Sequence, residues 1–266
     1  MFKDITIGQY YPTGSYVHEL DPRTKILVTF ALIVGLFIIN TFIPYAYIVA
    51  FILGVVFISK IPLRYILKGL KPLRVIIIFT FLVNVFMSQG DIILSIGPLN
   101  ATREGVYRAI FMAFRLILLV VGTSLLTLTT SPISLTDGIE QLLNPLRGIG
   151  VPAHELAMMM TIALRFIPTL LEETDKIMKA QMARGADFES GNIISRAKGL
   201  VPLLVPLFIS AFRRADELAM AMEARCYRGG ENRTKMKELK MRRKDTIALT
   251  VTSFLLVVLV VHRIVL

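Results

Sequence analysis

Thr246–Val261, which reads TIALTVTSFLLVVLVV, is the clearest apolar run in the chain and predicts a helix that crosses a membrane. Four earlier apolar runs predict four further spans: Ile26–Ile39, Ile43–Ile58, Val75–Met87 and Val106–Leu128. Apolar side chains make up 55% of the 266 residues, charged ones only 18%, and the mean hydropathy is +0.66. The sequence therefore predicts an all-α integral membrane protein with about five transmembrane helices.

The distribution of Lys and Arg predicts the orientation of these spans. Residues 60–74 carry five basic side chains, whereas residues 88–102 carry none. By the positive-inside rule the first loop is cytoplasmic and the second lies outside. We therefore expect a multi-pass protein of the plasma membrane, with a cytoplasmic N terminus and the C terminus outside. The net charge of +11 comes largely from residues that flank apolar runs, and no recognition motif accompanies it, so we expect a lipid bilayer and no nucleic acid as its partner.

These spans divide the chain into three parts. Residues 1–129 hold four predicted transmembrane helices, residues 246–266 hold the fifth, and residues 130–245 form a cytoplasmic region between them. Apolar side chains at helical spacing predict a long helix from about Pro152 to Gly185. A second predicted helix runs from about Ser195 to Arg225 and contains the apolar run Leu200–Phe212, which is interrupted by Pro202 and Pro206. We interpret that run as a core or interfacial segment, with a re-entrant or crossing segment left open.

Both predicted cytoplasmic helices end in similar pentapeptides. Gln181-Met182-Ala183-Arg184-Gly185 closes the first helix and Met222-Glu223-Ala224-Arg225-Cys226 closes the second, 41 residues later. An arginine at a helix C terminus can simply complement the helix dipole, an effect of about 0.3 to 1 kcal/mol. The recurrence of the Ala-Arg pair favours docking to a partner, because a small alanine lets the helix end enter a groove where the guanidinium can bind a carboxylate in fork geometry.

The chain resembles the transmembrane T component of energy-coupling factor transporters, the importers that bacteria and archaea use for vitamins and metal ions. Its opening segment is similar to that family's signature at Gly8-Gln9-Tyr10, Ser15, His18, Leu20-Asp21-Pro22-Arg23 and Lys25. Leu164-Arg165-Phe166-Ile167-Pro168, followed by Ala183-Arg184-Gly185, resembles the family's long coupling helix and its first tip. The second tip departs from the pattern, because Cys226 stands where the family often has glycine. We therefore expect the helix-ending backbone conformation to shift to Gly229.

The resemblance implies a division of labour among several chains. Two ABC-type ATPases would each bind one coupling tip, formed by Ala183, Arg184 and Gly185 or by Ala224, Arg225 and Cys226, and a separate membrane-embedded S component would bind the substrate. This chain would be a non-catalytic coupling subunit without a cofactor of its own, with ATP and Mg bound by the partner ATPases. The sequence agrees in one respect, since it contains no G-x-x-x-x-G-K-[ST] phosphate-binding loop.

Several other residues allow two interpretations each. Met side chains on the long helices fill a core or form a surface that repacks against exchangeable S components; the candidates are Met158, Met159, Met178, Met182 and Met220. Arg115, within the fourth predicted span, either snorkels to the interface or contacts the S component.

Two other classes of function remain open. An intramembrane lipid-modifying enzyme could use acidic side chains as acids or metal ligands, the candidates being Asp21, Glu172, Glu173 and Asp175. No motif supports it, and the three histidines lack ligand spacing, so no metal site is expected. A stand-alone secondary transporter would need paired broken spans, at which only Pro202 and Pro206 hint. Transport by the purified chain without ATP would identify the secondary transporter.

Overall fold

The structure, a computed structural model, describes residues 10–96, 99–186, 188, 193–229, 236 and 238–265. Gly8 and Gln9 of the opening segment, and Gly230 after the second tip, lie outside these ranges. The chain forms two compact units, one from the described parts of residues 8–138 and 239–266 and the other from residues 139–238. We call them the membrane unit and the coupling unit and describe each by itself.

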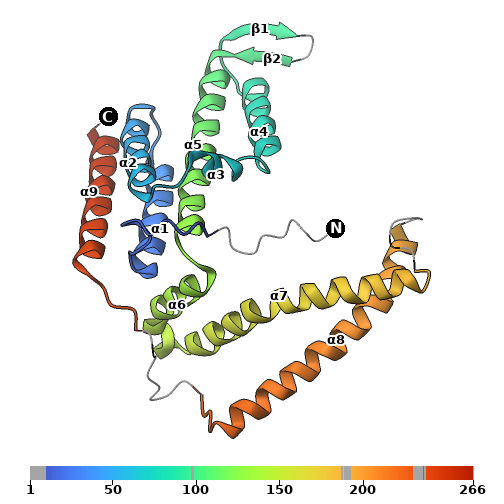
Figure 1. The fold of residues 1–266 in the computed structure, drawn as a ribbon. Coiled ribbons are helices and arrows are strands. Elements are labelled where there is room, and N and C mark those ends of the chain that lie inside the picture. Colours follow the sequence, from blue (N-terminus) through green and yellow to red (C-terminus); the bar gives the residue numbers. More distant parts are fainter. Residues whose placement is uncertain are drawn as a thin grey trace. The chain divides into compact units, whose positions relative to one another are not determined.

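The membrane unit contains all five predicted spans as helices (Figure 1). They are α1 (Pro22–Ile38), α2 (Ile43–Ser59), α4 (Arg74–Met87), α5 (Arg103–Thr129) and α9 (Arg243–Val265). In each case the helix includes nearly the whole predicted apolar run and extends it by a few residues. The prediction of an all-α membrane protein is therefore confirmed.

Length and composition single out three of the described helices as able to cross a membrane: α5, α9 and also α7 (Ala153–Ala183) of the coupling unit. The helices α2 and α4 are apolar but shorter. By the same test α8, which contains Leu200–Phe212, is not among the candidate spans found in the described residues. The assignment of residues 130–245 to the cytoplasm stays a prediction.

Several short elements were not predicted. They are the helices α3 (Leu63–Lys68) and α6 (Pro132–Leu143), the 3-10 helix η1 (Asn144–Ile149), and an antiparallel hairpin of β1 (Ile92–Ile96) and β2 (Leu99–Thr102). Thr102 links the hairpin to the next helix, because its Oγ1 accepts a hydrogen bond from the Gly105 amide at 3.0 Å and donates one to the Ser88 carbonyl at 3.0 Å. The hairpin therefore ends in a side-chain cap for α5.

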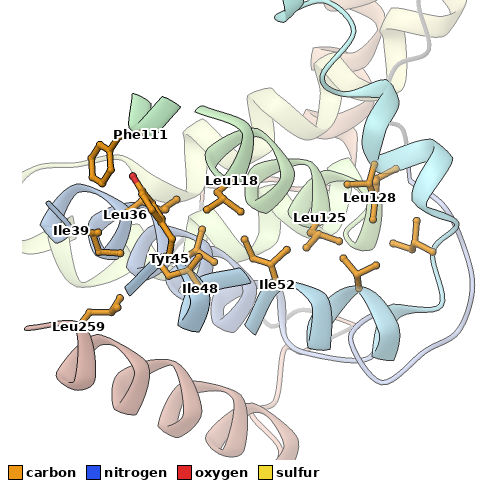
Figure 2. Packing of buried hydrophobic residues seen from close by; sticks show 14 residues of the cluster. Leu36, Ile39, Tyr45, Ile48, Ile52, Phe111, Leu118, Leu125, Leu128 and Leu259 are labelled. Atoms are coloured by element: carbon orange, nitrogen blue, oxygen red, sulfur yellow. The ribbon is translucent and has the colours of Figure 1, made fainter. Parts of the chain in front are cut away.

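The apolar core of the membrane unit lies where α1, α2, α5 and α9 meet (Figure 2). Leu36 of α1, Ile48 of α2 and Leu259 of α9 are almost completely buried there. Gly35 shows how closely two of these helices approach, because a Cβ added to it would lie 3.1 Å from Leu259 Cδ1. Small residues at such positions favour helix packing in membranes, where van der Waals contact replaces the hydrophobic driving force.

A buried carboxylate joins the first and last helices at their N-terminal ends. Asp245, only 1% exposed, accepts hydrogen bonds from the Asp21 amide at 2.7 Å and from the Arg242 amide at 2.8 Å. Asp21 in turn caps α1 by accepting the Arg23 amide at 2.9 Å. Burial alone would raise the pKa of Asp21, but the hydrogen bonds and charge of Arg23 outweigh it and hold that pKa below its ordinary value.

Other residues of the opening segment bind the ends of further helices. Lys25 Nζ donates to the carbonyls of His18 at 3.0 Å and Thr129 at 2.9 Å. The Thr13 hydroxyl donates to the Ser59 carbonyl at 2.8 Å, and the Tyr11 amide to the Leu128 carbonyl at 2.9 Å. Together with the hydrogen bonds of Asp245, these contacts join α1, α2, α5 and α9. We call the whole set the polar junction.

Arg115 binds the opposite end of α1. Its Nη2 donates to the Ile39 carbonyl at 2.6 Å, and its guanidinium lies 5.0 Å from the Phe111 ring centroid and 5.5 Å from that of Phe37. Arg263 of α9 donates to the neighbouring Ile38 carbonyl at 3.1 Å. Both cations therefore satisfy carbonyls at the negative end of α1, which gives Arg115 a structural role inside the unit. Its contact with an S component stays a prediction.

We expect Asp245→Ala to lower the free energy of unfolding by about 2 to 3 kcal/mol, because it leaves two backbone amides of the polar junction without acceptors. Thermal unfolding of the purified full chain in detergent measures this effect. Glu19→Ala is the matched control, since the exposed Glu19–Lys244 pair at 2.6 Å joins the same two segments. Exposed pairs contribute little, so the control should leave the unfolding midpoint nearly unchanged. Equal losses in both variants would contradict the role of Asp245.

Candidate functional site

Two long helices dominate the coupling unit. α7 (Ala153–Ala183) runs in one direction and α8 (Ile193–Ala224) returns, as Figure 1 shows. These bounds confirm both predicted helices to within two residues at each end. Pro168 lies inside α7, and both helices continue through their prolines although each proline removes one backbone hydrogen bond. The interruption expected at Pro202 and Pro206 therefore does not end α8.

An ion pair joins α7 and α8 at equivalent positions. Glu173 Oε2 accepts a hydrogen bond from Arg214 Nη2 at 2.7 Å, with 24% and 30% of the two side chains exposed. The two residues are 41 positions apart, the offset that also relates Arg184 to Arg225. An apolar groove of about 330 Å³ adjoins the pair, with Phe166 and Leu170 on one side and Met222 on the other. The helices are thus held together between their two tips.

The two tips have the same backbone geometry. At the first, the Gly185 amide donates to the Met182 carbonyl at 3.0 Å and the Ala186 amide to the Gln181 carbonyl at 3.0 Å. The second repeats both bonds 41 residues later: Cys226 to Glu223 at 2.8 Å and Tyr227 to Met222 at 3.0 Å. This pair of bonds defines a Schellman motif, in which the arginine is the C-cap residue directly after the last residue of each helix.

A left-handed residue follows each arginine. Gly185 has φ +88° and Cys226 has φ +56°. The expected shift of this conformation to Gly229 is therefore wrong: Cys226 adopts it at the helix end, and Gly229 has φ +89° in addition. The Schellman bonds place the left-handed residue directly after the arginine. Cys226 therefore adopts this conformation, although it costs an L-residue about 1 to 2 kcal/mol.

Both tips expose their side chains. Ala183, Arg184, Ala224 and Arg225 are all exposed, and within the described residues neither arginine forms an ion pair. A guanidinium with five free donors beside a small alanine suits a carboxylate on another chain. The structure thus brings together, within each tip, all three residues that the sequence singled out.

Comparison with known proteins places this arrangement in a family. Residues 13–236 match the family model CbiQ, described as "Cobalt transport protein". A protein of Thermosediminibacter oceani, named "Energy-coupling factor transporter transmembrane protein EcfT", is 64% identical over 261 residues, which cover 98% of each chain. The chain belongs to the CbiQ/EcfT family. Proteins of the same name from Clostridium kluyveri and Bacillus subtilis are 60% identical over 266 residues (99% of this chain, 98% of the relative) and 53% identical over 247 residues (92% and 93%).

For this member of the CbiQ/EcfT family, the predicted Met surface is exposed only in part. Met159, Met182 and Met220 are about half exposed or more, whereas Met158 and Met178 are half-buried. The choice between a core and a contact surface for these side chains therefore stays a prediction.

A larger exposed apolar surface lies on α8. Its side chains recur at three- and four-residue spacing on one side of the helix, and we call them the α8 apolar face: Val201, Leu204, Val205, Phe208 and Phe212. Phe208 is 61% exposed and Phe212 is 69% exposed. The helical period of the run Leu200–Phe212 predicts that α8 has an apolar face, and the structure shows that this face is exposed.

The acidic and histidine side chains are arranged as structural groups. Asp21 caps α1, Glu173 pairs with Arg214, and His154 Nδ1 lies 3.0 Å from Glu140 Oε1. Within the described residues no three His, Cys, Asp or Glu side chains gather as a metal site would require. Of the acids considered for an enzyme, Asp21 belongs to the membrane unit, whereas Glu172, Glu173 and Asp175 belong to the coupling unit.

The left-handed cysteine leads to a prediction about the tips. We expect Cys226→Gly to slow amide exchange at Tyr227 by about two- to fivefold, because glycine adopts φ +56° without the steric cost. Gly185→Cys is the matched reverse variant and should speed exchange at Ala186 by a similar factor. Hydrogen–deuterium exchange of the full chain measures both. Unchanged exchange at both amides would show that the left-handed positions carry no strain.

Proposed function

We propose that this chain is the T component of an energy-coupling factor importer, which transmits ATP-driven motion of two ABC-type ATPases to a substrate-binding S component for vitamin or metal-ion uptake. The observation that carries the proposal is the pair of Schellman-ended helices, each presenting an exposed Ala-Arg pair whose arginine has no ion-pair partner among the described residues. The names of the relatives support the transporter class. The chain itself would be non-catalytic.

Each tip would dock into a groove on one ATPase. The alanine leaves room for the helix end, and the guanidinium would bind a carboxylate in the groove through two parallel hydrogen bonds. The C-terminal end of a helix dipole is negative and by itself would favour a cationic neighbour, so the arginine is the group that selects an acidic groove. ATP and Mg would be bound and used by the partner ATPases alone.

The S component would contact the coupling unit through its exposed apolar side chains. The α8 apolar face and the exposed Met159, Met182 and Met220 are the largest such groups described there. Thioether and aromatic side chains repack at low cost, which suits partners that exchange or move. Arg115, bound to the Ile39 carbonyl, is a weaker candidate for this contact.

The orientation follows from the basic residues. The N terminus and the tips would be cytoplasmic and the C terminus outside, because the loop of residues 60–74 is basic and that of residues 88–102 is not.

A stand-alone secondary transporter is the second candidate, favoured only by the prolines inside α7 and α8.

We expect Arg184→Glu and Arg225→Glu each to reduce co-purification of the ATPases at least tenfold, because a reversed charge would face an acidic groove. The tagged full chain is co-expressed with two candidate ABC ATPases and the recovered subunits are measured. Lys179→Glu is the matched control, an exposed charge reversal on α7 away from the tip. If wild type recovers no ATPase, or if both tip variants recover as much as the control, the docking assignment fails.

We expect the double variant Phe208→Glu and Phe212→Glu to release a co-expressed S component while both ATPases are retained, because it places two carboxylates in the α8 apolar face. Subunit recovery from the same co-expression measures this. Arg213→Glu changes the charge of an exposed neighbour without removing an aromatic ring and should retain all subunits. Retention of the S component by the double variant would exclude this face as its contact.

A further inference from the structure

A groove of about 510 Å³ in the membrane unit lies between α3, the start of α4 and the middle of α5. Four cations line it, from α3, from the turn after it and from the first residue of α4: Arg64, Lys68, Lys71 and Arg74. The rest of the lining is apolar, with Leu67 on α3, Ile78 on α4 and Ile117 on α5. We call it the basic groove.

The cations of the basic groove have no carboxylate to neutralise them. All four are exposed, and none forms an ion pair within the described part of the chain. Lys68 Nζ lies over the Tyr65 ring, 5.1 Å from its centroid. The sequence explains the lack, since no Asp or Glu occurs between Asp21 and Asp91. Four like charges around one groove repel each other, and an anion bound among them would relieve that repulsion.

The first turn of α4 adds to the positive potential. α4 begins at Arg74, no side chain caps its N terminus, and no acidic residue lies in its first turn. The positive end of the helix dipole is therefore directed at the same groove as the cations.

The apolar lining indicates that the anion carries a hydrocarbon chain. Leu67 is 58% exposed and Ile78 is 52% exposed, although both lie beside charged side chains. A free phosphate would neutralise the cations and leave this apolar surface uncovered.

The larger cavity of the membrane unit, about 570 Å³ between α1, α2, α5 and α9, lacks this combination. Of the cations that line it, Lys25 donates to two backbone carbonyls and Lys244 pairs with Glu19 at 2.6 Å. Its charges are already satisfied, so it offers no comparable site for an anion.

We propose that the basic groove binds one anionic glycerophospholipid from the adjacent membrane leaflet, with its phosphate among Lys68, Lys71 and Arg74 and an acyl chain along Leu67, Ile78 and Ile117. This binding requires neither ATPase nor S component and does not depend on the function of the tips. The lipid would fix the short helix α3 at the membrane surface by contacts with both its charged and its apolar side chains.

Native mass spectrometry of the full chain, equilibrated with equal amounts of phosphatidylglycerol and phosphatidylcholine of identical acyl chains, tests the proposal. We expect wild type to retain one phosphatidylglycerol in preference to phosphatidylcholine. The double variant Lys68→Gln and Lys71→Gln should weaken that binding about 10- to 30-fold, because each basic residue near an anionic surface contributes to the binding free energy. Lys176→Gln with Lys179→Gln is the matched control, because it removes the same two charges from exposed positions of α7.

Glycerol 3-phosphate at millimolar concentration should not displace the lipid, because it cannot fill the apolar part of the groove. Displacement by that compound, equal retention by both double variants, or no preference over phosphatidylcholine would each overturn the proposal. Protection of Lys68 from an amine-reactive reagent only when partner subunits are bound would assign the groove to a protein contact instead.

Discussion

The membrane unit depends on the hydrogen bonding of one buried carboxylate, that of Asp245. At 1% exposure the carboxylate is almost fully buried, and both of its oxygens accept hydrogen bonds from backbone amides, those of Asp21 and Arg242. The bond to Asp21 joins residues 224 positions apart. It thereby closes the membrane unit from its first helix to its last. The core of Leu36, Ile48 and Leu259 packs between helices whose ends are held by these hydrogen bonds.

The sequence sufficed to predict the features that depend on continuous runs of apolar residues. Apolar runs located α1, α2, α4, α5 and α9, because the length of a span is a property of consecutive residues. It did not reveal the hairpin before α5, whose Thr102 hydroxyl donates a hydrogen bond to the Ser88 carbonyl, fourteen positions earlier. Nor could it decide between the interpretations of Arg115, because the Ile39 carbonyl that it binds is 76 residues away and is brought near only by packing.

The coupling tips show the same contrast between features that the sequence predicts and features that only the folded structure reveals. Their shared motif was evident in the sequence, and the Schellman bonds explain why the arginine occupies the same position in both. The backbone of Cys226 was predicted wrongly because the preference of glycine for positive φ was given more weight than the register of the bonds. The sequence could not predict that one side of α8 is exposed, because a helical period shows that a face is apolar but not whether anything covers it.

The ion pair between Glu173 and Arg214 makes the coupling unit mechanically symmetric. Each residue lies eleven positions before the arginine of its own tip, so each tip is about 16 Å along its helix from this contact. A rotation of one helix against the other about that contact would displace two arms of equal length. For a turn of about 10° each tip would sweep roughly 3 Å. The same rotation of either helix about this contact would therefore displace its own tip by the same distance.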